Sequence, residues 1–151
     1  MIFPYQSMIS ESPDGVDYVL FLRPEIPATI IGPAGSETFF GLVDTGSDNT
    51  ILPKSIADQL GIPLRAASGP PAIVFGGRSL RMLIGEVGFA LTSENETYRW
   101  AATVQFFEFE SPEEETVVLG HSGFLDYFTA IFDGKEGLLT LQANDLLPVV
   151  E

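Results

Sequence analysis

The chain has 151 residues, which is enough for one domain with a substantial core and short for two. Its formal net charge of −14 argues against binding to nucleic acid or to an anionic membrane surface, because both carry negative charge themselves. Cysteine is absent and there is one histidine, so thiol nucleophiles, cysteine-based zinc sites and multi-histidine metal sites within one chain are excluded. We expect neither a metal nor another cofactor.

The sequence carries no recognisable membrane or secretion signal. No apolar run approaches the length of a membrane span, and the first residues lack a basic stretch followed by an apolar segment. The lack of cysteine weakly favours a reducing compartment. We therefore expect a soluble, cytoplasmic protein that does not bind membranes.

Short apolar runs separated by turn residues dominate the chain, with 15 glycines and 11 prolines between them. This pattern predicts about ten short strands and two short helices in one domain, 1–151, and Pro24 and Pro27 are expected to break the chain between strands. In chain order, the main predicted strands are Val16–Arg23, Ala28–Ile31, Glu37–Val43, Leu80–Leu91, Tyr98–Phe109, Thr116–Leu119, Thr129–Phe132 and Leu138–Leu141. The predicted helices are Ser55–Leu60, capped by Ser55 and stopped by Gly61, and Ser122–Phe128.

One carboxylate follows the most apolar predicted strand. Phe39–Val43 has the pattern of a strand buried on both faces, and it ends at Asp44, which is therefore expected to be short of water. Gly46 lets the backbone turn sharply beside the carboxylate, and the Thr45 hydroxyl can bond across a tight contact. Two such carboxylates brought together share one proton, so one serves as general acid and the other activates a water molecule. The chain has one Asp-Thr-Gly, so a second copy related by a two-fold axis must supply the second carboxylate.

The residues around this tripeptide resemble a known family. Leu42–Pro53 is similar to the active-site segment of retropepsin-like aspartic peptidases, which include the retroviral proteases and their bacterial and eukaryotic relatives. Val118-Leu119-Gly120, followed by Phe124–Phe128, resembles the second hallmark of that family, an apolar pair and a glycine before a short helix. The resemblance extends over roughly Pro24 to Gln142.

The resemblance implies an all-β fold, a single-lobe closed β-barrel with one or two short helices. Its parts are the N-terminal strands 1–23, the catalytic loop 44–47, a flap at about 67–79, the second motif and helix 117–128, and the C-terminal hairpin 129–142. A flap is a glycine-rich hairpin that closes over the substrate. Its tip is expected near Phe75-Gly76-Gly77, with Gly69-Pro70-Pro71 as the alternative.

The resemblance also implies a function, that of a homodimeric endopeptidase acting on extended polypeptides. Asp44 is then catalytic, Thr45 bonds to the partner chain, and Gly46 helps to bind the substrate backbone. Ser47 and Asp48, together with the flap residues, are expected to line the substrate site. The alternative is a catalytically silent module of the same fold that binds or scaffolds as a dimer.

His121 occupies the position where this family commonly has an arginine that pairs with the acid equivalent to Asp48. A His121–Asp48 pair is therefore one expectation, and a plain surface role is the simpler one. A hydrolase that uses Ser122 with His121 is disfavoured, because adjacent residues at a helix start do not face each other and no Gly-x-Ser-x-Gly motif is present. The acidic run Glu113–Glu115 is predicted to be a solvated loop rather than a metal site.

Overall fold

The fold is taken from a computed structural model that describes residues 1–69, 72–73, 79–80 and 82–148. The strands are β1 (Ile2–Pro4), β2 (Gln6–Glu11), β3 (Tyr18–Arg23), β4 (Glu25–Gly32), β5 (Gly35–Val43), β6 (Ile51–Pro53), β7 (Arg65–Ala66), β8 (Ala72–Ile73), β9 (Ser79–Leu80), β10 (Leu83–Ser93), β11 (Glu96–Phe107), β12 (Val117–Leu119), β13 (Phe128–Asp133) and β14 (Leu138–Ala143). The helical elements are α1 (Lys54–Leu60) and two one-turn 3₁₀ helices, η1 (Pro112–Glu114) and η2 (Leu125–Tyr127).

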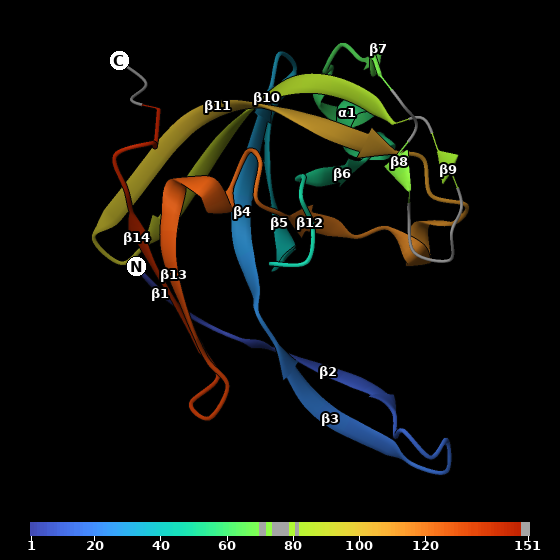
Figure 1. The fold of residues 1–151 in the computed structure, drawn as a ribbon, viewed down its shortest axis with the longest axis vertical. Helices are drawn as coiled ribbons and strands as arrows, with labels where there is room; N and C mark the ends of the chain where they lie inside the picture. The colour runs from blue at the N-terminus through green and yellow to red at the C-terminus, as the bar shows by residue number, and fades with distance from the viewer. Residues whose placement is uncertain (70–71, 74–78, 81, 149–151) are drawn as a thin grey trace.

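Six strands form a closed barrel, in the order β11-β6-β12-β5-β4-β10, and the β10–β11 hairpin closes the ring (Figure 1). The contacts of β5 with β12 and of β6 with β11 are parallel, whereas the other neighbours in the ring are antiparallel. A separate sheet, β1-β14-β13, packs Phe3, Leu139 and Leu141 into the same core. The predicted all-β closed barrel is therefore confirmed.

Trp100 on β11 is the centre of an aromatic cluster in the core. Its ring lies 5.3 Å from that of Phe89, 5.7 Å from that of Phe124 and 5.6 Å from that of Phe128, measured between ring centroids. The indole N–H donates a 2.9 Å hydrogen bond to the carbonyl oxygen of Gly123. This buried bond satisfies the one polar atom of the side chain and ties the segment after β12 to the barrel wall.

Two hairpins and one helix end agree closely with their predictions. The β10–β11 hairpin turns at Glu94 and Asn95, and β13 and β14 pair along their full length, as their alternating apolar residues indicate. Helix α1 ends at Gly61, which adopts φ +67° as the left-handed cap predicted for it.

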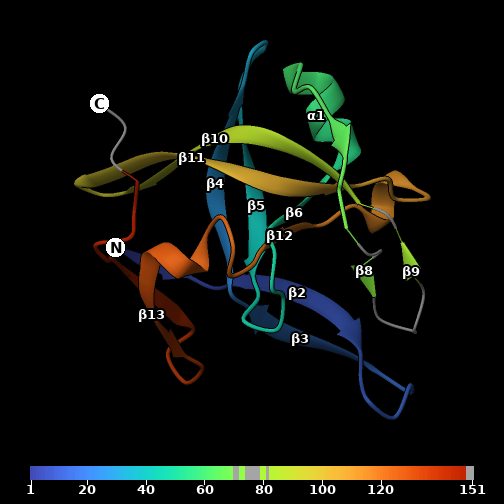
Figure 2. The same ribbon diagram turned by 45° about the horizontal axis from the view of Figure 1, so that its top comes forward.

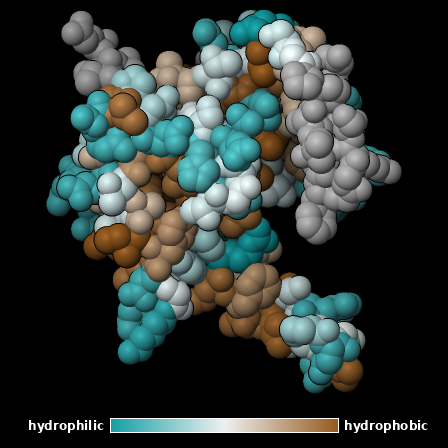
Figure 3. All heavy atoms as spheres, viewed as in Figure 1, coloured by the Kyte–Doolittle hydropathy of each residue, from teal (hydrophilic) through white to brown (hydrophobic). Residues whose placement is uncertain are grey.

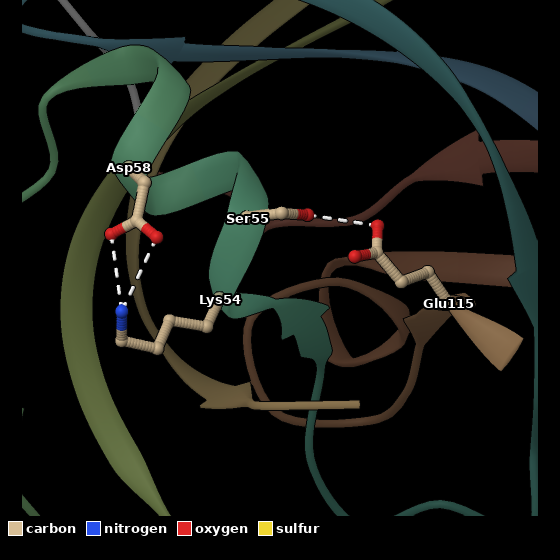
Figure 4. Close-up of polar contacts among 4 residues, drawn as sticks. All are labelled: Lys54, Ser55, Asp58 and Glu115. Atoms are coloured by element: carbon tan, nitrogen blue, oxygen red, sulfur yellow. Dashed lines mark hydrogen bonds and ion pairs between the residues drawn. The ribbon is translucent and has the colours of Figure 1, made fainter. Parts of the chain in front are cut away.

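The start of α1 differs from its prediction, because Pro53 precedes the first helical residue and Ser55 lies inside the first turn. The Ser55 hydroxyl donates instead to Glu115, at 2.8 Å, so the helix holds the end of the acidic loop (Figure 4). On the same helix, the Lys54 ammonium lies 3.2 Å from the carboxylate of Asp58. Glu113 and Glu114 are exposed, as expected for a solvated loop.

Three other predictions of local structure are wrong. Pro27 lies within β4 rather than breaking it, because β10 pairs with β4 only over Thr29–Ile31 and leaves the strand without a second neighbour at Pro27. Strand β5 is buried on one face only, and Phe40 on its outer face is 56 % exposed. The helix predicted over Ser122–Phe128 is reduced to η2, since Gly123 adopts φ +91°, which no right-handed helix allows.

Strands β2 and β3 form a hairpin that projects from the barrel, and we call residues 6–23 the arm (Figures 1 and 2). At its tip, hydrogen bonds from the Ser12 hydroxyl and from the Val16 N–H hold the pKa of Asp14 below its ordinary value. The predicted strand Val16–Arg23 is thus confirmed from Tyr18 onward, with its first residues in this turn.

Candidate active site

The loop that carries Asp44 leaves the barrel between two neighbouring parallel strands. β5 pairs with β12, and Val43 lies opposite Leu119. The Asp44 N–H donates a 3.1 Å hydrogen bond to the Leu119 carbonyl oxygen, which continues the pairing by one residue. The chain then turns back, and the Gly46 N–H donates to Oδ1 of Asp44 at 2.9 Å. The carboxylate is therefore held in place by its own loop.

The two motifs predicted from the sequence meet in the structure. The segment after β12 runs against the loop 44–50 and pairs with it through backbone hydrogen bonds. These bonds run from the His121 N–H to the Ser47 oxygen (3.0 Å), from the Ser122 N–H to the Asp48 oxygen (2.9 Å) and from the Thr50 N–H to the Ser122 oxygen (3.1 Å). The second motif therefore braces the loop along most of its length.

Gly120 is needed for this close crossing. A Cβ atom built on Gly120 would lie 2.2 Å from the carbonyl oxygen of Asn49 and 2.7 Å from that of Ser47. Both are backbone atoms that are fixed by the pairing, so no side chain fits at this position. Gly120 thus lets the two backbones cross in close contact, a role that could not be predicted from the sequence.

The side chain of His121 contacts the same loop. Its Nε2 lies 2.9 Å from the Thr45 carbonyl oxygen, which can only accept, so Nε2 carries the proton in this bond. Nδ1 lies 3.8 Å from Oδ1 of Asp126. The His121 side chain therefore faces Asp126 and not Asp48, and it is exposed, as in the simpler surface interpretation. The Asp126 N–H also donates to the His121 carbonyl oxygen. Since both ring nitrogens contact these groups, the geometry gives no support to a hydrolase based on Ser122.

Asp44 is half-buried and reachable from solvent. It lies in an open depression with a volume of about 280 Å³, which Pro24, Leu42, Thr45 and Phe132 help to line. The expectation that Asp44 is removed from water is wrong for the single chain, because the outer face of β5 is not covered. Sequence reasoning missed Pro24 and Phe132 at this site, since neither belongs to a motif and only the fold brings them there.

The other predicted site residues fall into two groups. Thr45, Gly46 and Asp48 are exposed, and Thr45 also lines the depression. The Ser47 hydroxyl donates to the Asn49 carbonyl oxygen at 2.7 Å and so belongs to the loop itself. Phe75, Gly76 and Gly77 of the predicted flap lie outside the described residues, as do Pro70 and Pro71. The strands on either side of residues 74–78, β8 and β9, pair antiparallel as a hairpin requires.

Thr50, at the end of the loop, yields a stability prediction. It is fully buried, and its hydroxyl is the one buried side-chain polar atom without a hydrogen-bond partner in the described part of the chain. Replacing Thr50 with valine removes this unpaired group at nearly constant volume, so we expect the free energy of unfolding to rise by about 1 kcal/mol in urea denaturation. Thr50→Ser, which keeps the hydroxyl and loses the methyl group, should lower it by a similar amount. A destabilised Thr50→Val variant would show that the hydroxyl has a partner.

No protein-family model matches the chain, and none of the curated proteins searched matches it. Within the residues that the structure describes, no group of three or more His, Cys, Asp or Glu side chains is placed to hold a metal ion. No helix among these residues is long and apolar enough to cross a membrane.

Proposed function

We propose that two copies of this chain form an aspartic endopeptidase of the retropepsin-like type, which hydrolyses peptide bonds in extended polypeptides. The observation that carries the proposal is the site of Asp44, at the end of β5 and in a loop braced by the second motif, with its carboxylate open to solvent. The hydrogen bond from the Gly46 N–H orients the carboxylate and leaves it accessible to a water molecule and a substrate in the depression.

In the proposed reaction a water molecule lies between the two Asp44 carboxylates, one of which is protonated. The ionised carboxylate removes a proton from the water as the oxygen attacks the peptide carbonyl carbon, and the other carboxylic acid donates its proton to the carbonyl oxygen. The resulting tetrahedral diol collapses as the carboxyl group that took the proton from water donates it to the leaving nitrogen. The other carboxylate accepts a proton from one diol hydroxyl, and the C–N bond breaks. No covalent enzyme intermediate and no metal are required.

Each chain supplies one Asp44 carboxylate to this site. In the same dimer, Thr45 would contact the partner chain, and a flap would cover the substrate. Thr45 is exposed at the rim, where its hydroxyl is free to meet the partner chain across the two-fold axis. The hairpin of β8 and β9 supplies the proposed flap over the bound polypeptide.

Cleavage of an unbiased peptide mixture, followed by mass spectrometry from about pH 4 to pH 7, tests the proposal. We expect cleavage that is greatest in the acidic half of this range, because the shared proton is lost as the pH rises. Activity per chain should also rise with protein concentration, as the dimer forms. A confirmed dimer that cleaves nothing at any pH would instead indicate a binding or scaffolding module.

A further inference from the structure

The arm has few internal contacts to stabilise it. β2 and β3 pair only with each other, so both outer strand edges of the arm are unpaired within the described chain. The two strands extend away from the barrel in both views (Figures 1 and 2). An isolated two-stranded ribbon is marginally stable in water and usually gains its order from a third strand or a packed face. The arm is therefore expected to pack on a surface outside its own barrel.

One face of the arm is mostly apolar and open to solvent, apart from Leu22, which lies beside Gly137 of the β13–β14 loop. The strand register places Ser7 on this face near the root of the arm, and Glu11 on it beside Tyr18, towards the tip. The same face carries four large apolar side chains, those of Ile9, Leu20, Leu22 and Tyr18. These four side chains are 73 %, 69 %, 50 % and 74 % exposed, in that order. Figure 3 shows the resulting apolar stem of the arm, with a polar tip. A contiguous apolar face of this kind marks an interaction site.

A second copy can occupy this face only if the contact brings little charge together. The chain carries a net charge of −14, so two copies repel each other over most of their surfaces. The paired strands of the arm have no charged residue between Met8 and Ser10 or between Tyr18 and Leu22. The stem of the arm is thus a surface where an equally acidic copy would bury no like charge, whereas Glu11, Asp14 and Asp17 lie towards its tip.

The position of the arm points to the same occupant. The arm joins the barrel at Pro24, whose carbonyl oxygen accepts a 2.9 Å hydrogen bond from the Val43 N–H and which lines the depression beside Asp44. Two Asp44 carboxylates can share a water molecule only if the two-fold axis passes beside that depression. The partner's surface therefore begins next to the root of the arm. Phe132, 37 % exposed in the depression, and Phe40, 56 % exposed on β5, offer apolar surface there.

We propose that the arm is the main dimerisation element of this protein. The apolar face of the arm packs on a second copy of the chain around Phe40 and Phe132, through the side chains of Ile9, Tyr18, Leu20 and Leu22. Because the dimer is two-fold symmetric, the arm of the second copy makes the same contact with the first. The inference rests on the proposed function, because the half-site at Asp44 is what requires a second copy.

Sedimentation velocity over a range of protein concentrations tests the inference with a matched pair of variants. Leu20→Glu places a charge in the apolar face of the arm, and we expect it to weaken the dimer by about thirtyfold or more, the loss typical of a central interface residue. Leu146→Glu makes the same change on an equally open side chain, 64 % exposed, in the C-terminal segment. It should leave dimerisation unchanged.

A cysteine variant provides a second measurement that does not depend on a disruptive substitution. Because the chain has no cysteine, Leu20→Cys carries a single thiol. Its modification by a thiol reagent should slow as the protein concentration rises and the dimer covers it, whereas the thiol of Leu146→Cys should react at a constant rate.

The outcomes separate this inference from the proposed function. If Leu20→Glu dimerises as tightly as the wild type, the arm is not the interface and the peptidase proposal stands. If the wild type dimerises through the arm but cleaves no peptide, the arm inference stands and the peptidase proposal fails. A wild-type chain that stays monomeric at every concentration, with a Leu20→Cys thiol that is never protected, overturns the arm inference.

Discussion

Asp44→Asn is expected to abolish peptide cleavage, with a loss of about 10⁴-fold or more. The variant removes both the base that activates water and the acid that protonates the carbonyl oxygen, since each comes from one copy of Asp44. The amide is nearly isosteric, and its oxygen can still accept the hydrogen bond from the Gly46 N–H that holds the carboxylate in the wild type. We therefore expect unchanged folding and dimerisation, measured by thermal unfolding and sedimentation beside the cleavage assay.

The matched control for this variant is Asp58→Asn. Asp58 lies on α1 with its side chain 64 % exposed and forms a surface ion pair with Lys54, so the same chemical change should leave cleavage intact. Mixing wild-type and Asp44→Asn chains in equal amounts tests the shared site more sharply. After exchange of subunits, about one quarter of the dimers carry two aspartates, whereas independent monomeric enzymes would keep about one half of the activity. An Asp44→Asn variant that cleaves peptides would refute the catalytic assignment.

Gly120→Ala should destabilise the protein by about 3 kcal/mol or more and remove activity with it. The added methyl group would overlap the carbonyl oxygens of Asn49 and Ser47, and relieving the overlap breaks the backbone pairing between the two motifs. Urea denaturation monitored by the fluorescence of Trp100, the only tryptophan of the chain, measures the change.

Gly134→Ala is the control for this effect. A Cβ atom at Gly134, in the loop between β13 and β14, would meet no heavy atom within 4 Å. The free energy of unfolding of this variant should stay within about 0.5 kcal/mol of the wild-type value. Equal stability of the two variants would mean that the second motif does not cross the loop as closely as described.

Local patterns in the sequence predicted most of the strands, and contacts between distant segments account for what they missed. The β10–β11 and β13–β14 hairpins could be predicted because alternation and turn residues are local signals. The helix expected after Gly120 could not form, since the backbone of His121 and Ser122 pairs with the loop 44–50 and Gly123 reverses the chain. No sequence pattern in the second motif predicts this pairing with the loop 44–50.

The candidate site was also predicted only in part, because some of its residues are brought together by contacts between distant segments. The resemblance to retropepsin-like peptidases identified the loop and the second motif, and the fold brings them together. The roles of Pro24 and Phe132 depend on where the arm and the β13–β14 hairpin leave the barrel, which is a long-range property. The expectation that both faces of β5 are buried followed from its apolar residues, but Phe40 is exposed because no part of the described chain covers the outer face.

The dependence of the loop on β12 also determines when the site can exist during synthesis. The strand and glycine that brace Asp44 come from a much later part of the chain, so the contact has a high sequence separation and forms late. A nascent chain that has left the ribosome only as far as β11 carries Asp44 in an unbraced loop. The carboxylate site is therefore expected to form only after β12 and Gly120 have been made, and chains terminated before β12 should be inert.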